Sequence, residues 1–238
     1  MAPYLSIIIP TYNEEKRLPG TLDFIFAFLR KQTYEAEIIV SDDGSRDRTV
    51  KIAAEKLRFS DSQVLVSPRN IGKGDAVRRG MLAAKGQYLL ITDADLSTPI
   101  EEVRRFLRYL EAGDDIVIGS RALEDSKIEI HQSFYREIMG RVYNLIARAF
   151  SFKGIMDSQC GFKCFKSQVA KELFGLQKIN GFSFDAEILF LAQKKGYKIR
   201  EEPVIWRNSS QSRVQLIRDP IAMFFDLIKI RWIHRNLR

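Results

Sequence analysis

Short apolar runs alternate along the first half of the chain with longer segments in which apolar residues recur at helical spacing. The runs read as strands buried on both faces, and they cover Leu5 to Ile9, Ile38 to Val40, Val64 to Val66, Tyr88 to Ile91 and Ile116 to Ile118. The periodic segments predict helices over about residues 18–29, 46–57 and 72–84 and from Pro99 onward. Short connections between them are typical of right-handed βαβ units, so we predict an α/β fold with a mostly parallel central sheet flanked by helices.

Polar clusters follow the apolar runs at the points where the strands should end. They are Thr11 to Glu14, Asp42 to Ser45, Arg69-Asn70, and Asp93 with Asp95. In open parallel sheets, ligands bind beyond the carboxyl ends of the strands. Four clusters on one rim therefore predict a binding site rather than four independent turns.

The most informative cluster is Asp93-Ala94-Asp95, which directly follows a run of apolar residues. In an extended chain, residues i and i+2 point to the same side, so the two carboxylates can converge on one point. Paired carboxylate oxygens suit a hard cation, Mg²⁺ or Mn²⁺, that bridges the protein to a nucleotide diphosphate. The alternative is that the two aspartates merely end a strand and cap the next helix.

Several nucleotide-binding classes are disfavoured by the residues themselves. Gly72-Lys73-Gly74 is not followed by the third glycine of a dinucleotide-binding fingerprint, and the Lys-Ser/Thr pair of a P-loop is missing. Pro10 to Glu14 contains no glycine, which argues against the glycine-rich first loop of a nucleotidyltransferase.

The second half of the chain is less regular. Phe134 to Phe150 predicts a helix with a broad apolar arc opposite its arginines, which fits either a core helix or an amphipathic helix in a membrane interface. Phe162 to Phe165 and Val204 to Trp206 are predicted strands, and Phe184 to Lys195 is a predicted helix between them.

The last segment, Pro220 to Arg238, is apolar and basic at once. One of its stripes is apolar and aromatic and ends in Trp232, a residue suited to the headgroup boundary of a membrane. A second apolar strip runs through Met223, Leu227 and Ile230. We therefore expect this helix to contact the protein on one side and lipid or a partner helix on the other.

Composition narrows the class of partner. The chain has 238 residues, 45% of them hydrophobic, with a net charge of +8 and a pI of about 9.5. A basic protein of this size favours an anionic ligand: a nucleotide, a lipid phosphate, a membrane surface or nucleic acid. Nucleic acid is disfavoured because the positive charge is spread along the chain without a recognition motif. No stretch is apolar for long enough to predict a spanning helix, and Cys160 and Cys164 are expected to stay reduced.

Five motifs in fixed order carry a resemblance to a known family. They are Pro10-Thr11-Tyr12-Asn13-Glu14, Asp42-Asp43-Gly44-Ser45, Asn70-Ile71-Gly72-Lys73-Gly74, Asp93-Ala94-Asp95 and Gly119-Ser120-Arg121. Over nearly its whole length the chain resembles the inverting family-two glycosyltransferases with the A-type nucleotide-sugar fold, and within them the polyprenyl (dolichyl) phosphate sugar synthases. Asp157 to Lys163, followed by Phe182 to Glu187, looks most like the dolichyl-phosphate glucosyltransferase branch, with the mannosyl branch next.

The resemblance implies roles on the donor side. Pro10, Tyr12 and Glu14 would hold the nucleoside, and Asp42-Asp43-Gly44 would lie at the base or ribose. Lys73 would lie near the nucleotide. Asp93-Ala94-Asp95 would contact the donor sugar, with Asp93 and Asp95 as metal ligands. Some relatives carry a metal-coordinating glutamine where this chain has Ser97, so the group that completes the metal shell is open.

It also implies roles on the acceptor side. Arg121 and Arg136 would face the acceptor phosphate and act in catalysis with the two aspartates. Ser212-Arg213 looks like a mobile loop that closes over the site. Asp185 and Glu187 are acceptor-site candidates that could pair with these arginines or contact the sugar.

The implied reaction is transfer of a hexose, with glucose and UDP favoured, to a polyprenyl or dolichyl phosphate. It would invert the anomeric centre and depend on Mg²⁺ or Mn²⁺. A GDP-mannose-dependent mannosyltransferase and a soluble enzyme with a hydroxyl acceptor remain alternatives; the latter would need Asp185 or Glu187 as its base. Residues 1–122 would bind the nucleotide sugar, residues 123–218 the acceptor, and residues 219–238 would form a basic amphipathic helix. We expect a peripheral protein on the cytoplasmic face of an anionic membrane, with a homo-oligomer or membrane partner left open.

Overall fold

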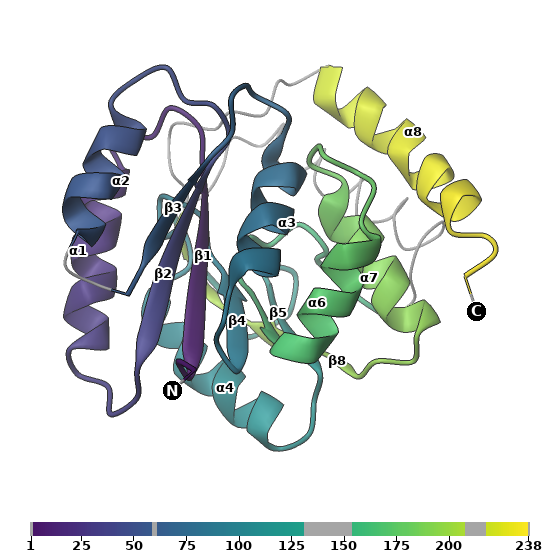
Figure 1. Cartoon of the computed structure of the whole chain (residues 1–238). Helices are drawn as coiled ribbons and strands as arrows, with labels where there is room; N and C mark the ends of the chain where they lie inside the picture. Colours follow the sequence, from purple (N-terminus) through teal and green to yellow (C-terminus); the bar gives the residue numbers. More distant parts are fainter. Residues whose placement is uncertain (1, 59–60, 131–153, 208–217, 238) are drawn as a thin grey trace.

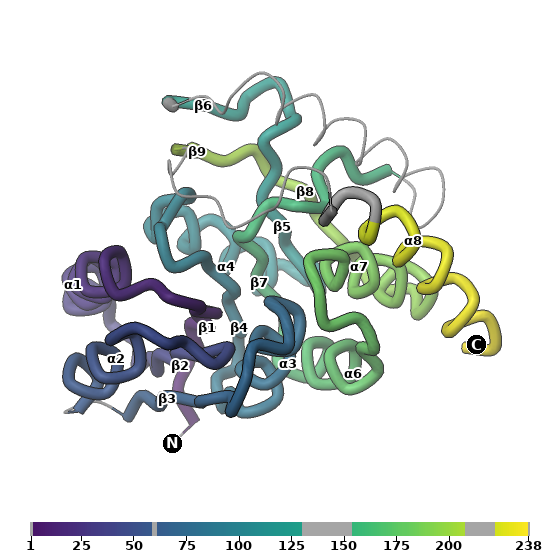
Figure 2. Tube along the Cα trace, turned by 90° about the horizontal axis from the view of Figure 1, so that it is seen from above, coloured from purple at the N-terminus to yellow at the C-terminus, as the bar shows by residue number. Residues whose placement is uncertain are grey.

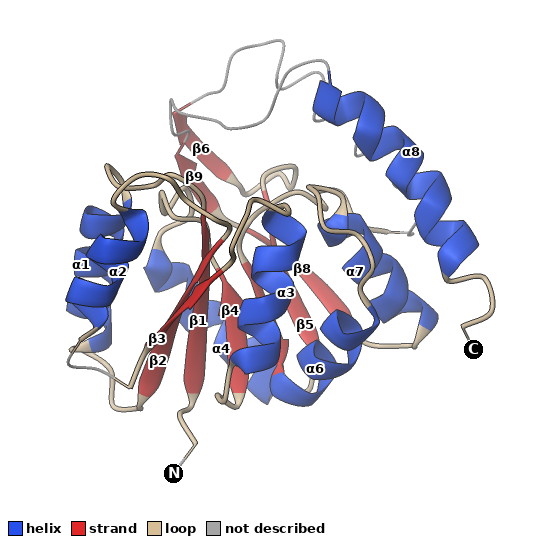
Figure 3. Cartoon of the chain, turned by 45° about the horizontal axis from the view of Figure 1, so that its top comes forward, coloured by secondary structure: helices blue, strands red, loops and turns tan. Residues whose placement is uncertain are grey.

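The computed structural model describes residues 2–58, 61–130, 154–207 and 218–237, and within them a central sheet carries helices on both faces (Figures 1 and 3). The sheet order is β3-β2-β1-β4-β7-β5-β8. Its strands are β1 (Leu5–Thr11), β2 (Ala36–Asp42), β3 (Gln63–Val66), β4 (Tyr88–Ile91), β5 (Ile116–Ser120), β7 (Lys163–Lys166) and β8 (Ile199–Pro203). The helices are α1 (Leu18–Leu29), α2 (Thr49–Leu57), α3 (Lys73–Ala83), η1 (Ile100–Glu102), α4 (Val103–Glu111), α6 (Ser167–Leu176), α7 (Phe184–Lys194) and α8 (Arg218–Ile233).

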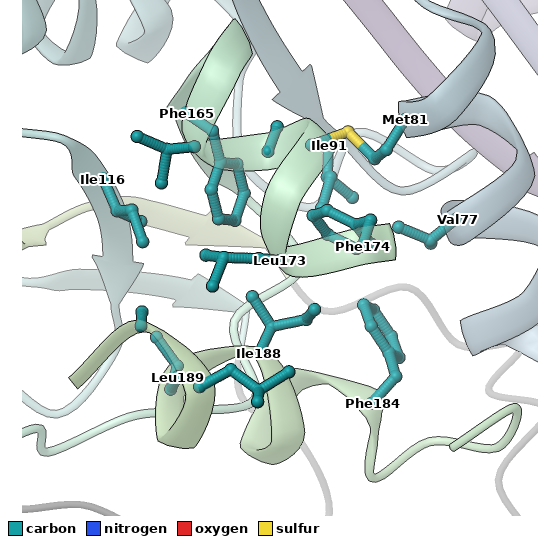
Figure 4. Close-up of a cluster of buried hydrophobic side chains, with 14 of the residues drawn as sticks. Val77, Met81, Ile91, Ile116, Phe165, Leu173, Phe174, Phe184, Ile188 and Leu189 are labelled. Atoms are coloured by element: carbon teal, nitrogen blue, oxygen red, sulfur yellow. The ribbon is translucent and has the colours of Figure 1, made fainter. Parts of the chain in front are cut away.

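The sequence pattern explains the layers. Along β1, Leu5, Ile7 and Ile9 pack on one face of the sheet and Ile8 on the other, and all four are fully buried. One face is covered by α1, α2 and α4, and the opposite face by α3, α6 and α7. Figure 4 shows the second layer, where Phe174 of α6 lies near Val77 of α3 and Ile188 of α7 lies beneath. The predicted doubly covered, mostly parallel α/β sheet is confirmed.

One strand breaks the parallel pattern. β7 lies between β4 and β5 and runs antiparallel to both, so that Lys163 is in register with Ile91 and Ile118. The predicted strand near Phe162 to Phe165 is therefore present, but its first residue, not its last, lies at the carboxyl ends of β4 and β5. The chain that leads into β7 reaches the same rim as the loops after the parallel strands.

Three elements of the second half were not predicted: β6 (Lys127–Ile130), β8 and α6. β6 pairs with β9 (Ile205–Arg207) in a separate two-stranded sheet, and β9 corresponds to the predicted strand near Val204 to Trp206. The predicted helix over Phe134 to Phe150 lies outside the described residues. Cys160 and Cys164 are buried free thiols, as expected for reduced cysteines.

α8 lies along α7 at the edge of the molecule away from α1 (Figures 1 and 2). Leu227 and Ile230 are buried against the α7 layer. On the other side, Phe225 and Trp232 are 62% and 66% exposed, and Ile228 is exposed between them. The expected contact of this helix with the protein is present on one side, and the expected contact of the other side with lipid or a partner helix stays a prediction.

Candidate active site

The loops after β1 and β2 are joined into one platform at the rim. The Asn13 amide donates to Ser45 Oγ at 2.8 Å, and the Glu14 amide donates to Thr49 Oγ1 at 2.7 Å. Asn13 has a positive φ of 53°, which an asparagine adopts more readily than most residues. The Pro10 to Glu14 turn is therefore held by the loop after β2 and by the first residue of α2.

Asp42 and Asp43 organise the neighbouring loops. Asp42 is fully buried and accepts hydrogen bonds from Thr11 Oγ1 at 3.1 Å and from the Ser45 amide at 2.8 Å. Asp43 accepts from the amides of Ile71 and Gly72, at 2.8 and 2.9 Å. Burial raises the pKa of Asp43 although these two amides oppose the shift. Asp42 and Asp43, two of the predicted donor-side carboxylates, thus shape the loops of the site.

Gly44 shows how closely these loops pack. Its φ is +74°, and a Cβ at this position would collide with the backbone of Arg69 and Asn70. The loop after β2 therefore contacts the loop after β3 backbone to backbone, as only a glycine permits here.

Asp93 lies at the centre of a charged cluster. β4 ends at Ile91, so the two aspartates sit in the turn beyond the strand rather than in extended chain. Lys73 Nζ, from the start of α3, lies 2.6 Å from Asp93 Oδ1. Burial alone would raise the pKa of Asp93, but Lys73, Lys163 and Arg121 outweigh it and lower that pKa. Burial opposes the charge on Lys73 as well, yet Asp93 and Asp185 hold its pKa above the ordinary value.

Asp95 is held by different partners. The Ser97 amide and hydroxyl donate to its Oδ1 at 3.0 and 2.8 Å. Its Oδ2 lies 3.4 Å from Arg17 Nη1, and the same guanidinium binds Glu14 through Nε at 2.6 Å. Burial opposes the charge on Arg17, but Glu14, Asp95 and Asp93 together raise its pKa. Arg17 therefore connects the turn after β1 to the aspartate turn.

The segment before β7 packs directly on Asp93. A Cβ on Gly161 would overlap the Asp93 carboxylate, so this glycine sets how closely the two approach. Four residues earlier, Asp157 forms a paired contact with Arg121, at 2.6 Å from Nε and 2.9 Å from Nη2. Burial alone would raise the pKa of Asp157, but Arg121 lowers it well below the ordinary range.

A second buried pair lies beside the cluster. Lys163 Nζ lies 2.6 Å from Asp185 Oδ1, and these side chains are 2% and 8% exposed. Burial raises the pKa of Asp185 although Lys163 and Lys73 oppose it. Among the described residues, Asp185 pairs with Lys163, and its predicted pairing with an arginine or contact with the sugar stays a prediction. Glu187, two residues later in α7, instead contacts Lys178, Ile179 and His234.

The structure brings most of the predicted residues to one rim, and their roles remain predictions. This rim, formed by strand ends, the loops after them and the starts of helices, carries Pro10, Tyr12, Glu14, Asp42, Asp43, Gly44, Lys73, Asp93, Ala94, Asp95, Arg121 and Asp185. Among the described residues, Glu187 contacts Lys178, Ile179 and His234 and none of this set. Arg136, Ser212 and Arg213 lie outside the described residues.

Four residues of the cluster had no predicted role: Arg17, Ser97 as a partner of Asp95, Asp157 and Lys163. A signal existed for Lys163, since a lysine within the apolar run Phe162 to Phe165 needs a buried partner. Arg17 sits three residues after Glu14, the spacing at which helical side chains pair. Asp157 gave no comparable signal, because its partner is 36 residues away.

The donor atoms fit a divalent cation only in part. Asp93 and Asp95 offer hard carboxylate oxygens, and Ser97 engages one oxygen of Asp95, leaving Oδ2 facing Arg17. Among the described residues, no three His, Cys, Asp or Glu side chains gather as a metal site. The two carboxylates of Asp93 and Asp95 suit an ion such as Mg²⁺, which takes its remaining ligands from a diphosphate and water.

Comparison with known proteins decides the family. The profile of glycosyl transferase family 2 matches residues 6–174, which contain every described rim residue except Asp185. The chain belongs to glycosyl transferase family 2. It is therefore a glycosyltransferase, as the motifs predicted.

Two curated relatives of this glycosyltransferase are close to it over most of their length. It is 38% identical to a dolichyl-phosphate beta-glucosyltransferase of Dictyostelium discoideum, over 96% of this chain and 74% of that protein. It is 32% identical to a dolichyl-phosphate beta-glucosyltransferase of Homo sapiens, over 95% of this chain and 74% of that protein.

A solved structure supports the fold. Glucosyl-3-phosphoglycerate synthase from Mycobacterium tuberculosis, solved with Mn²⁺, UDP and glucosyl-3-phosphoglycerate, superposes with a TM-score of 0.66 at 19% identity. The superposition covers 96% of this chain and 78% of that one. The expected A-type nucleotide-sugar fold is confirmed.

Proposed function

We propose that this glycosyltransferase transfers glucose from UDP-glucose to a dolichyl or polyprenyl phosphate, with inversion at the anomeric carbon. The observation that carries the proposal is the extent of the similarity to the Dictyostelium beta-glucosyltransferase, 96% of the chain. It spans the donor loops after β1 to β4 as well as the segment around β7 and α7 on the acceptor side.

On the donor side, Pro10, Tyr12, Glu14 and the Asp42-Asp43-Gly44 loop would hold the nucleoside. The joined loops support this, because a preorganised platform loses little conformational entropy on binding. Lys73 would approach the diphosphate, and its pairing with Asp93 supports a place at the centre of the site. The first half of the chain, residues 1–122, is thus the proposed donor half.

Asp93 and Asp95 would hold Mg²⁺ or Mn²⁺. When bound, the cation would stabilise negative charge on the leaving nucleoside diphosphate as a Lewis acid. The protein's own part is orientation: Ser97 fixes Asp95 through one oxygen, and Gly161 and Lys73 fix Asp93. The Mn²⁺ and UDP in the mycobacterial structure support the same assignment by similarity of fold.

On the acceptor side, Arg121 would bind the lipid phosphate. Asp157 takes two of the guanidinium's five donors and thereby fixes its orientation, and the others suit a phosphate. Trp206 lies against the same guanidinium: Arg121 Cζ is 5.5 Å from the centroid of the Trp206 ring. Arg136 and Ser212-Arg213 would complete this acceptor half, residues 123–218.

A phosphate acceptor needs no catalytic base. Its second pKa is about 6, by analogy with phosphorylated side chains, so at pH 7 its oxygen is largely ionised and can attack the anomeric carbon directly. The Lys163–Asp185 pair supports this reading, because Asp185 already binds an ammonium group at 2.6 Å. One observation favours the hydroxyl-acceptor alternative instead: burial raises the pKa of Asp185, as a general base requires.

The proposal is tested by incubating the protein with dolichyl phosphate and a panel of UDP- and GDP-sugars, with free dolichol as the matched acceptor that lacks the phosphate. We expect a glucosylated lipid only with UDP-glucose and only with the phosphate. Transfer from GDP-mannose would replace the donor assignment. Transfer to the free alcohol or to a soluble sugar would contradict the phosphate acceptor.

We further propose that the enzyme works on an anionic membrane surface, from the cytoplasmic side, through α8. No helix among the described residues has the length and hydropathy to span a bilayer. The outer face of α8 combines exposed Phe225, Ile228 and Trp232 with exposed Lys229 and Arg231. Aromatic side chains insert at the headgroup boundary, and each basic residue near anionic lipid adds about 1 kcal/mol.

We expect the protein to float with vesicles that contain anionic lipid and to detach at high salt. Replacing both Phe225 and Trp232 with serine should reduce flotation strongly while UDP binding is retained. The matched control is Phe24→Ser, which removes an equally exposed phenylalanine (69%) from α1 on the opposite side of the molecule. If the double variant floats as well as wild type, the α8 assignment is wrong.

A further inference from the structure

The proposed reaction gives no role to the buried carboxylate of Glu187. Glu187 lies in the first turn of α7 and is fully buried. Its Oε1 accepts the Lys178 amide at 2.9 Å, and its Oε2 accepts the Ile179 amide at 2.8 Å. The third partner directly follows α8: His234 Nε2 lies 2.6 Å from Oε1. A buried carboxylate is costly to leave short of partners, so these three contacts depend on one another.

The loop that Glu187 holds, residues 177–181, packs on the start of α3. Gln177 Nε2 bridges the carbonyls of Gly74 and Ile179, at 2.9 and 2.7 Å. The Asn180 carbonyl accepts the Asp75 amide at 3.3 Å. A Cβ on Gly74 would approach the Ile179 carbonyl to 2.7 Å, so backbone lies directly against backbone.

Lys73 stands between the two glycines of this junction. Gly72, with a φ of +137°, has no room for a Cβ beside the Asn180 carbonyl. The 177–181 loop therefore supports the backbone from which Lys73 reaches Asp93 at 2.6 Å. A continuous set of contacts runs from α8 through His234, Glu187 and this loop to Lys73.

We propose that His234 is a positioning residue that couples the docking of α8 to donor binding. By holding Glu187 it fixes the 177–181 loop, and through that loop the Lys73 ammonium at the donor diphosphate. The proposal rests on the proposed donor site. In it, the outer side of α8 binds the membrane, and His234 on the inner side supports the nucleotide site. Because coupling between sites is reciprocal, engagement of α8 and binding of the nucleotide should favour one another.

Two substitutions of nearly equal size separate this role from packing alone. His234→Leu fills the space but cannot bind Glu187, whereas His234→Gln keeps an N–H donor at a similar reach. By titration calorimetry with UDP and Mn²⁺, we expect His234→Leu to weaken UDP binding about 2- to 30-fold, the range for substitutions along coupling networks. His234→Gln should bind UDP within about twofold of wild type. Equal UDP affinity of folded wild type and His234→Leu would overturn the proposal.

Hydrogen exchange tests the coupling without any nucleotide. In His234→Leu, amides in residues 177–181 and 72–76 should exchange faster than in wild type, and those of β1 should be unchanged. Faster exchange confined to α8 and Glu187's own turn would overturn the link to Lys73. If wild type binds no UDP, the proposed donor fails, while this measurement still decides the coupling. If His234→Leu does not fold, His234→Asn, whose shorter amide falls short of Glu187, takes its place.

Discussion

Replacing Asp95 with alanine should lower turnover by about 100-fold to 1,000-fold or more while the fold is retained. Asp95 is partly exposed at the rim, so its loss creates no large cavity. What the variant loses is a carboxylate at the leaving diphosphate, where the proposed cation would bind. The measurement is glucosyl transfer at saturating donor and acceptor, with thermal unfolding to confirm the fold.

Asp95→Asn refines this test. The asparagine keeps an oxygen for the Ser97 amide and hydroxyl, so the turn geometry is retained while the negative charge is lost. If charge is what matters, Asp95→Asn should be nearly as impaired as Asp95→Ala. The control Asp61→Ala removes an exposed aspartate just before β3 and should behave as wild type. Full activity of either Asp95 variant, or of wild type in excess EDTA, would refute the metal assignment.

Replacing Lys163 with methionine should destabilise the protein by about 3–5 kcal/mol, the usual effect of removing one partner of a buried ion pair. Lys163 and Asp185 are almost completely buried, so the remaining carboxylate would lose its hydrogen-bonded counter-charge without gaining water, and only the more distant Lys73 would oppose its charge. Chemical denaturation gives the free energy of unfolding directly. The double variant Lys163→Met with Asp185→Leu should recover most of this loss, because no isolated charge remains. Recovery of less than about 1 kcal/mol would mean that the pair is not the source of the effect.

The same pair decides between the two acceptor chemistries. A general base contributes about 10²- to 10⁴-fold to turnover, so Asp185→Asn would be nearly inactive if Asp185 were the base. With an ionised phosphate as acceptor, we expect the folded variant to keep activity within about tenfold of wild type. The assay must be run well below the unfolding temperature, because the variant also weakens the pair with Lys163.

Much of the fold followed from the sequence because local pattern and tertiary environment agree in the first half. Leu5 to Ile9 is apolar except for Ser6, as a strand covered on both faces requires, and it is buried throughout. Gly72-Lys73-Gly74 predicted the start of α3, and here too the residue types match their surroundings. At both glycines the backbone approaches another loop so closely that no Cβ would fit. The second half was predicted less well: β6 and β8 are short and rich in charged residues, and α6 was missed although its buried residues recur at helical spacing.

By itself, the sequence determined which residue types stand at the strand ends, and hence that a carboxylate-rich rim would form. The same motifs determined the family to which the chain belongs. Only the tertiary structure decided the partners within that rim. β7 enters the sheet antiparallel between β4 and β5, and this brings Gly161 and Lys163 beside Asp93 although they are far from it along the chain. Likewise Glu187 follows Asp185 by only two residues, yet it contacts α8 instead of the rim. The physical reason is that strand order and helix packing are set by burial summed over the whole chain, and no local pattern records them.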